Sequence, residues 1–166
     1  MYSVSHMLNG TYQLSVPEQG GNIPYLGEVS CHTLSTVFCS AGKYFESHPE
    51  YFALRDGVRV PLQLCLTDEK VYEIVLDEVL NDLKEEHDSK ADLQIISLSQ
   101  ADNNDYCECD KCRTLDDANG SHAGSLITFV NRIAAAVKEK GYNNVAFDTL
   151  AYQYTRKAPS AVSCKI

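Results

Sequence analysis

The feature that most constrains this fold is an alternation of short apolar strands with amphipathic helices. Residues 93–99 form a near-continuous apolar run, which is typical of a strand buried on both faces of a parallel sheet. A helical pattern over 121–140 separates this run from a second strand candidate at 145–151. Because parallel strands need such a crossover between them, the pattern predicts an α/β fold with a parallel sheet.

Both predicted helices carry signals at an end and along one face. Thr67 offers a capping hydroxyl to a helix over 69–86, and acidic residues occupy its first turn. The helix over 121–140 is expected to end at Gly141, in the left-handed position that favours glycine. The apolar stripes are Val71, Val75, Val79 and Leu83 in the first helix, and Leu126, Phe129, Val130, Ile133 and Val137 in the second.

Other segments complete or interrupt this pattern. A short strand is predicted at 27–32, after an irregular lead-in over 1–26 that is rich in turn formers. Residues 44–60 are predicted to form an inserted helical turn and a β-hairpin, because an aspartate–glycine pair stands between two apolar runs. Residues 100–120 are predicted to be a long polar loop. Three strands cannot close a barrel of eight units, so we predict one domain, a partial (β/α) TIM-barrel segment.

Charge and hydropathy exclude two classes of partner. The net charge is −9, from 14 basic and 23 acidic side chains, so a phosphate backbone would be repelled and nucleic acid is not an expected partner. No apolar run approaches the roughly 20 residues that span a bilayer, so no membrane partner is expected. The first residues have neither the cationic start nor the apolar stretch of a signal peptide, which leaves the location open.

Polar side chains gather where the predicted strands end, which is where parallel α/β proteins place their sites. Such groups exchange hydrogen bonds with hydroxyls, and tyrosine adds a flat apolar face, so we predict a polyol site. Each also has a purely structural interpretation: a hydrogen-bonded histidine, a turn or helix cap, or core tyrosines. The candidates are His32 after the first strand, Gln100 and Asp102 after the second, and Asp148, Tyr152 and Tyr154 in or after the third.

Three of the seven cysteines, Cys107, Cys109 and Cys112, stand within six residues. Thiolates at this spacing can converge on one cation, and zinc prefers four such ligands. Cys65 is the fourth ligand that we favour, and His32 and His122 are the alternatives. A loop of reduced cysteines, or a disulfide from Cys65 to one of the three, would explain the same pattern.

Several phrases of this sequence, taken together, are typical of one family. They are Cys-His-Thr at 31–33, Lys-Tyr-Phe-Glu-Ser-His-Pro-Glu-Tyr-Phe-Ala-Leu-Arg-Asp-Gly at 43–57, Ser-Leu-Ser-Gln-Ala-Asp at 97–102, Tyr-Cys-Glu-Cys-Asp-Lys-Cys at 106–112 and Asp-Thr-Leu-Ala-Tyr-Gln-Tyr-Thr at 148–155. Over residues 8–159 the chain resembles a bacterial family catalogued as domain of unknown function 4838, which is common in polysaccharide-degrading bacteria. Its barrels look like those of the β-hexosaminidase and α-glucuronidase glycoside hydrolases.

The resemblance implies carbohydrate processing by a secreted or periplasmic (β/α) barrel, whose remaining strands would come from the rest of a parent chain. Glycosidases place two carboxylates about 5 to 9.5 Å apart across the scissile bond. Asp102 is the catalytic candidate in this chain, and we expect its partner in the other half of the barrel. The alternatives are a carbohydrate-binding barrel without catalysis and a zinc-stabilised structural domain.

Overall fold

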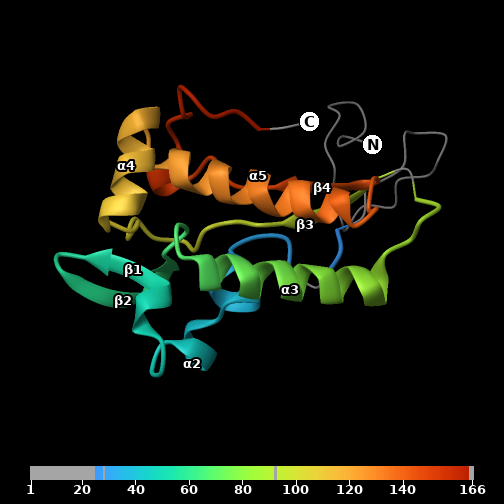
Figure 1. Cartoon of the computed structure of the whole chain (residues 1–166), viewed down its shortest axis with the longest axis horizontal. Coiled ribbons are helices and arrows are strands. Elements are labelled where there is room, and N and C mark those ends of the chain that lie inside the picture. The colour runs from blue at the N-terminus through green and yellow to red at the C-terminus, as the bar shows by residue number, and fades with distance from the viewer. Residues whose placement is uncertain (1–24, 28, 92, 165–166) are drawn as a thin grey trace, which may run out of the picture.

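A parallel pair of strands, β3 (Gln94–Ser97) and β4 (Val145–Asp148), lies beside two long helices, α3 (Glu69–Glu86) and α5 (Ala123–Glu139) (Figure 1). The computed structural model describes residues 25–27, 29–91 and 93–164. This mixed α/β composition confirms the predicted class, and the larger barrel stays a prediction. The other elements are η2 (Leu34–Phe38), α2 (Ala41–Tyr44), η3 (Pro49–Tyr51), β1 (Phe52–Arg55), β2 (Val58–Leu64), α4 (Asp110–Asn119) and η4 (Gln153–Thr155).

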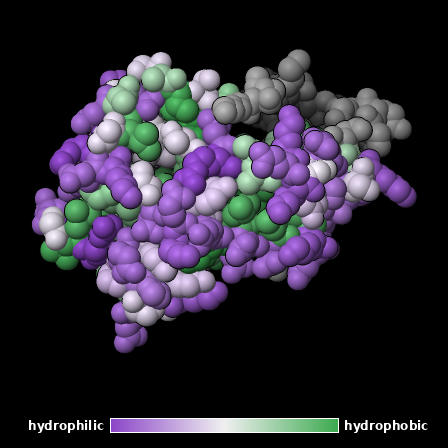
Figure 2. All heavy atoms as spheres, in the orientation of Figure 1, coloured by the Kyte–Doolittle hydropathy of each residue, from purple (hydrophilic) through white to green (hydrophobic). Residues whose placement is uncertain are grey.

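The parallel pairing of β3 and β4 agrees with the sequence prediction. Gln94 lies opposite Val145, and Ser97 lies opposite Asp148. The predicted stripes of α3 and α5 are buried in the same core as two residues of the β3 segment, Ile96 and Leu98. Polar residues cover most of the face seen in Figure 2, as expected when both helices turn their apolar sides inward.

The ends of the two long helices follow ordinary capping chemistry. Asp68, rather than Thr67, caps α3, because its carboxylate accepts hydrogen bonds from the backbone N–H groups of Lys70 (2.8 Å) and Val71 (3.3 Å). Gly141 follows α5 with a φ of 97°, which confirms the predicted left-handed position. Neither these helices nor any other in the described parts of the chain is long and apolar enough to cross a bilayer.

The strand predicted at 27–32 is wrong in position. Only Tyr25 makes a bridge to β3, in parallel with Ile95, and the residues before it lie outside the described chain. Gly27 has a φ of 81°, which is not an extended strand conformation. In place of backbone hydrogen bonds between strands, the Thr33 side chain joins this segment to the end of β3. Its hydroxyl donates to the carbonyl of Ser97 (2.6 Å) and accepts from the backbone N–H of Ser99 (3.1 Å).

The inserted hairpin is confirmed, and it reaches further than residue 60. β1 and β2 pair antiparallel around a turn at Asp56 and Gly57, both with positive φ, and β2 continues to Leu64. The hairpin projects to one side of the helices in Figure 1. Its sheet is separate from that of β3 and β4.

The segment predicted as a polar loop over 100–120 contains a helix, α4. The polar composition of α4 explains why the sequence did not predict it. Only one side of this helix is buried, through Cys112, Asp116 and Asn119. None of these is an aliphatic residue, so no apolar stripe marks the helix. α4 ends at Gly120, with a φ of 60°, and packs directly against α5.

We predict that Gly124→Ala destabilises the fold through the α4–α5 contact. A Cβ at Gly124 would lie 2.8 Å from Asn119 Cβ and 2.9 Å from the Leu115 carbonyl oxygen, so the helices must separate. The expected loss is about 1–3 kcal/mol of unfolding free energy, measured by urea denaturation. Gly42→Ala is the control, since its Cβ meets no described atom within 4 Å. Equal stability of the two variants would contradict this packing.

Candidate functional site

Three predicted site residues converge beyond the carboxyl ends of β3 and β4, and we call this region the rim. The His32 ring lies 6.3 Å from the Tyr152 ring, centroid to centroid. The exposed carboxylate of Asp102 accepts a hydrogen bond from Gln153 Nε2 (3.0 Å). The rim therefore joins side chains from three segments that are far apart in the sequence.

Gln153 is a rim residue that was not among the six predicted site residues. Its amide holds Asp102, and its Oε1 accepts a hydrogen bond from Asn104 Nδ2 (3.0 Å). Gln153 and His32 both have left-handed backbone conformations, with φ values of 53° and 57°. Such strain in residues other than glycine is uncommon and collects at functional sites. No local sequence pattern announces a left-handed glutamine, so only the folded chain reveals it.

Hydrogen bonding sets the protonation of Asp102. Bonds from Gln153 and Tyr152 lower the pKa of the Asp102 carboxyl, and the nearby His32 lowers it further. Desolvation raises the pKa of Asp102 by more than His32 lowers it, but the two hydrogen bonds outweigh desolvation. Asp102 is thus an ionised carboxylate at neutral pH, which suits a base or a hydrogen-bond acceptor better than a general acid.

The other three candidates lie apart from this exposed cluster. Gln100 is fully buried, and its Nε2 donates to the carbonyls of Leu150 and Tyr152 (both 3.0 Å). The last residue of β4, Asp148, accepts a hydrogen bond from the hydroxyl of Tyr25 (2.5 Å). Tyr154 is half-buried and lies 5.8 Å from the Tyr106 ring, toward α4. Gln100 still contributes to the rim through its carbonyl, which is 2.7 Å from His32 Nδ1.

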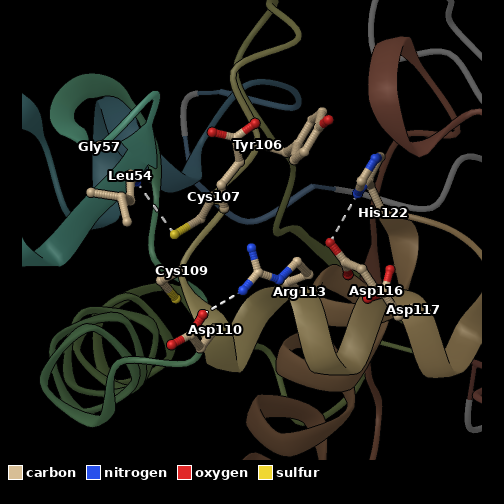
Figure 3. Close-up of a pocket in the computed structure, with 11 residues that line it drawn as sticks. Leu54, Gly57, Tyr106, Cys107, Cys109, Asp110, Arg113, Asp116, Asp117 and His122 are labelled. Atoms are coloured by element: carbon tan, nitrogen blue, oxygen red, sulfur yellow. Dashed lines mark hydrogen bonds and ion pairs between the residues drawn. The ribbon is translucent and has the colours of Figure 1, made fainter.

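A cavity of about 660 Å³ lies between the hairpin turn and α4 (Figure 3). Leu54 and Gly57 of the hairpin line one side, and α4 lines another. Cys107 and Cys109 also lie on its wall, so the cavity borders the predicted cysteine centre.

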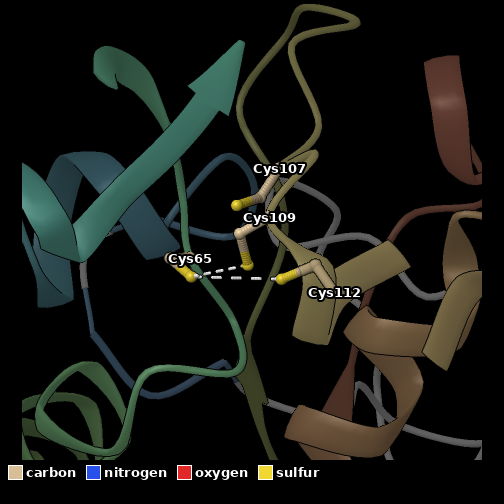
Figure 4. Close-up of side chains that lie close together, drawn as sticks. All are labelled: Cys65, Cys107, Cys109 and Cys112. Atoms are coloured by element: carbon tan, nitrogen blue, oxygen red, sulfur yellow. Dashed lines mark hydrogen bonds between the residues drawn. The ribbon is translucent and has the colours of Figure 1, made fainter. Parts of the chain in front are cut away.

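The four predicted cysteines converge on one centre (Figure 4). Cys65, Cys107, Cys109 and Cys112 bring their Sγ atoms within 4.8 Å of one another, and three of the four residues are buried. The Sγ of Cys65 is 3.6 Å from that of Cys109 and 4.0 Å from that of Cys112. A disulfide bond is about 2.05 Å long, and all seven cysteines are free, so the four form a thiol cluster. Cys65 is the fourth member, as favoured, and the alternatives His32 and His122 are not.

The hairpin and the start of α4 hold this cluster together. Cys65 directly follows β2, and Cys109 is the N-cap of α4. The backbone N–H of Leu54 in β1 donates to Cys107 Sγ (3.4 Å), and that of Glu108 donates to the Leu54 carbonyl (2.8 Å). Hydrogen bonds to sulfur from backbone amides are typical of the surroundings of metal-bound thiolates.

The family model described as Domain of unknown function (DUF4838) matches residues 3–165. The chain belongs to this family. No curated protein and no solved structure matches it. Membership agrees with the resemblance carried by the sequence phrases, whereas the likeness to glycoside hydrolases is no part of this finding.

In this DUF4838 chain, contacts within the cluster shift the pKa values of Cys65, Cys107 and Cys112 in different directions. Hydrogen bonds from Cys107 and Cys112 lower the pKa of Cys65. The Cys112 bond lowers the pKa of Cys107, but the bond with Cys65 and burial outweigh it and raise the value to about 12. Hydrogen bonds with Cys107 and Cys65, together with burial, raise the pKa of Cys112. The same contacts therefore favour a thiolate at Cys65 and oppose one at Cys112.

We predict that Gln153→Ala raises the pKa of Asp102. The folded-state pKa is depressed, so the carboxylate favours folding above the unfolded pKa, and this contribution is lost as pH falls through the folded pKa. Without the Gln153 bond the carboxyl should titrate closer to its ordinary range. Carboxyl carbon NMR over a pH series measures the change, with Lys138→Ala on α5 as the control. An unchanged Asp102 midpoint in Gln153→Ala would rule out this hydrogen bond as the cause.

Proposed function

We propose that this chain is a segment of a carbohydrate-processing protein, similar in mechanism to glycoside hydrolases, and that the rim binds sugar hydroxyls. The observation that carries the proposal is the convergence of His32, Asp102 and Tyr152 beyond the ends of parallel strands. Ligands of parallel α/β proteins bind at this end of the strands. An imidazole, a carboxylate and an exposed tyrosine supply the hydrogen bonds and the flat surface that a sugar ring needs.

Within this proposal Asp102 is the ionised member of a carboxylate pair. A general acid needs a raised pKa, whereas hydrogen bonds lower that of Asp102. Asp102 would therefore act as the base or nucleophile, or hold a sugar hydroxyl. The general acid would come from the part of the parent protein that completes the barrel. The parent protein would act outside the cytoplasm, as the family resemblance implies. The same rim without an acid partner would make a carbohydrate-binding surface, which is the alternative.

We predict that Asp102→Asn and Tyr152→Ala have different kinetic effects in the complete parent protein, assayed against a panel of aryl glycosides and uronides. Loss of a catalytic base should lower kcat about 10²–10⁴-fold. Loss of the tyrosine surface should chiefly raise KM. Asp77→Asn, an exposed change on α3, is the control. Saccharide binding without turnover would favour the non-catalytic alternative, and neither binding nor turnover would refute the carbohydrate role.

We also propose that the cysteine cluster binds one zinc ion with a structural role. Four ligands at a Zn–S distance of about 2.3 Å place their sulfur atoms about 3.8 Å apart. Cys65 Sγ is 3.6 Å from that of Cys109 and 4.0 Å from that of Cys112, and all four sulfur atoms lie within 4.8 Å of one another. In a [4Fe–4S] cluster each cysteine binds a different iron atom, which keeps all four sulfurs further apart. A site with four cysteines leaves no open position for a substrate, so its role would be to fasten the hairpin to α4.

Zinc is expected at about one equivalent per chain when the protein is purified without chelator. Above the dissociation constant, the free energy of unfolding should rise by about 1.4 kcal/mol for each tenfold increase in free zinc. Cys65→Ser should remove both the bound metal and this response. Cys31→Ser, at an exposed cysteine outside the cluster, is the matched control. Metal-free protein with four reactive cluster thiols would contradict the proposal.

A further inference from the structure

An unused histidine–aspartate pair lies at the wall of the cavity between the hairpin turn and α4 (Figure 3). His122 Nδ1 is 3.1 Å from Asp116 Oδ2, and Asp116 is 4% exposed. The other oxygen, Asp116 Oδ1, accepts a hydrogen bond from the backbone N–H of Ser125 (2.8 Å). An acceptor on Nδ1 fixes the tautomer with hydrogen on that nitrogen, so Nε2 of the neutral ring is left as an acceptor.

Stacking fixes the orientation of the same ring. The His122 ring lies on Tyr106, with centroids 3.6 Å apart and planes 19° from parallel. The guanidinium of Arg55 also lies over the Tyr106 ring, 4.5 Å from its centroid, so the tyrosine is itself held in place. His122 Nε2 points away from Asp116 in Figure 3 and has no hydrogen-bond partner among the described residues. His122 Nε2 is therefore an oriented hydrogen-bond acceptor at the wall of the cavity.

The charges around the cavity favour a neutral ligand. Both oxygens of Glu108 are engaged, by Arg55 Nη1 (2.8 Å) and by the backbone N–H of Asp56 (3.0 Å). Asp116 is engaged on both oxygens as well. Arg113 uses one N–H group on Asp110, 2.5 Å away, and keeps other donors for a ligand. An anion would meet these carboxylates, whereas a polyhydroxylated ligand can accept from Arg113 and donate to His122.

We propose that this cavity is a saccharide subsite in which His122 Nε2 accepts a hydrogen bond from a sugar hydroxyl and Arg113 donates one. The inference rests on the proposed carbohydrate role but uses none of the rim residues. Asp116 is a positioning residue that orients the imidazole. At about 660 Å³ the cavity is within the usual size range of small-molecule sites.

The test is ¹⁵N NMR of the whole chain labelled at histidine, titrated with three neutral probes: cellotetraose, maltotetraose and N-acetylchitotetraose. We expect at least one probe to shift the Nε2 resonance of His122. His48 is an internal control with the same local chemistry, because its Nδ1 is 3.1 Å from Glu50 and its ring stacks on Tyr51 with centroids 4.7 Å apart. His48 does not line the cavity, so its resonances should not move.

His122→Phe keeps a ring that can stack on Tyr106 and removes both nitrogens. It should weaken binding of the responding probe at least tenfold, and His48→Phe should not. If His122→Phe fails to fold, the wild-type titration alone decides. Shifts confined to His32 would overturn the cavity proposal and leave the rim proposal standing. No shift at His122 with any probe, or a stronger response there to inorganic phosphate, would also overturn it.

Discussion

The parallel register of β3 and β4 is the constraint on which the rest of the molecule depends. With Ser97 opposite Asp148, the segments that leave both strands start side by side. Beyond the ends of these short strands, hydrogen bonds from side chains to the backbone hold the segments together. The buried amide of Gln100 binds the carbonyls of two residues after β4, and the Thr33 hydroxyl binds the backbone of β3 from the other side. These hydrogen bonds join the segments that form the rim, whereas Gln100 Oε1, Asp148 Oδ1 and Thr149 Oγ1 are buried without a partner among the described residues.

The cysteine cluster is a second point of contact for the hairpin, whose Phe52 and Leu64 pack in the same apolar core as the helices. A separate small core contains Ala53, Cys65, Cys107 and Cys112, with few aliphatic side chains around it. So little apolar surface gives limited hydrophobic stabilisation. The ion pair of Arg55 with Glu108 joins the hairpin to the segment that carries Cys107 and Cys109, and Arg59 binds the Phe52 carbonyl within the hairpin (2.6 Å). Cysteines therefore make up most of the buried side chains in this small core.

The sequence predicted the elements with a regular apolar pattern and missed those without one. α3, α5 and the hairpin follow from period and turn chemistry. Three of the four cysteines followed from their spacing, and Cys65 was favoured from its position before the preceding helix. α4 was missed because its buried face carries a thiol, a carboxylate and an amide. The bond of Gln153 with Asp102 and the pair of His122 with Asp116 were missed for another reason. Their partners are brought by tertiary packing, and no local pattern encodes a contact between distant segments.

The cysteine cluster also has a consequence for the order of folding. A link between Cys65 and Cys109 encloses a segment 44 residues long, which contains α3 and β3. Closing a loop of this length in an unfolded chain costs about 4 kcal/mol of conformational entropy. Much of that entropy is already lost once α3 has packed on β3. Assembly of the four thiols is therefore cheapest as a late step, after the enclosed helix and strand have formed.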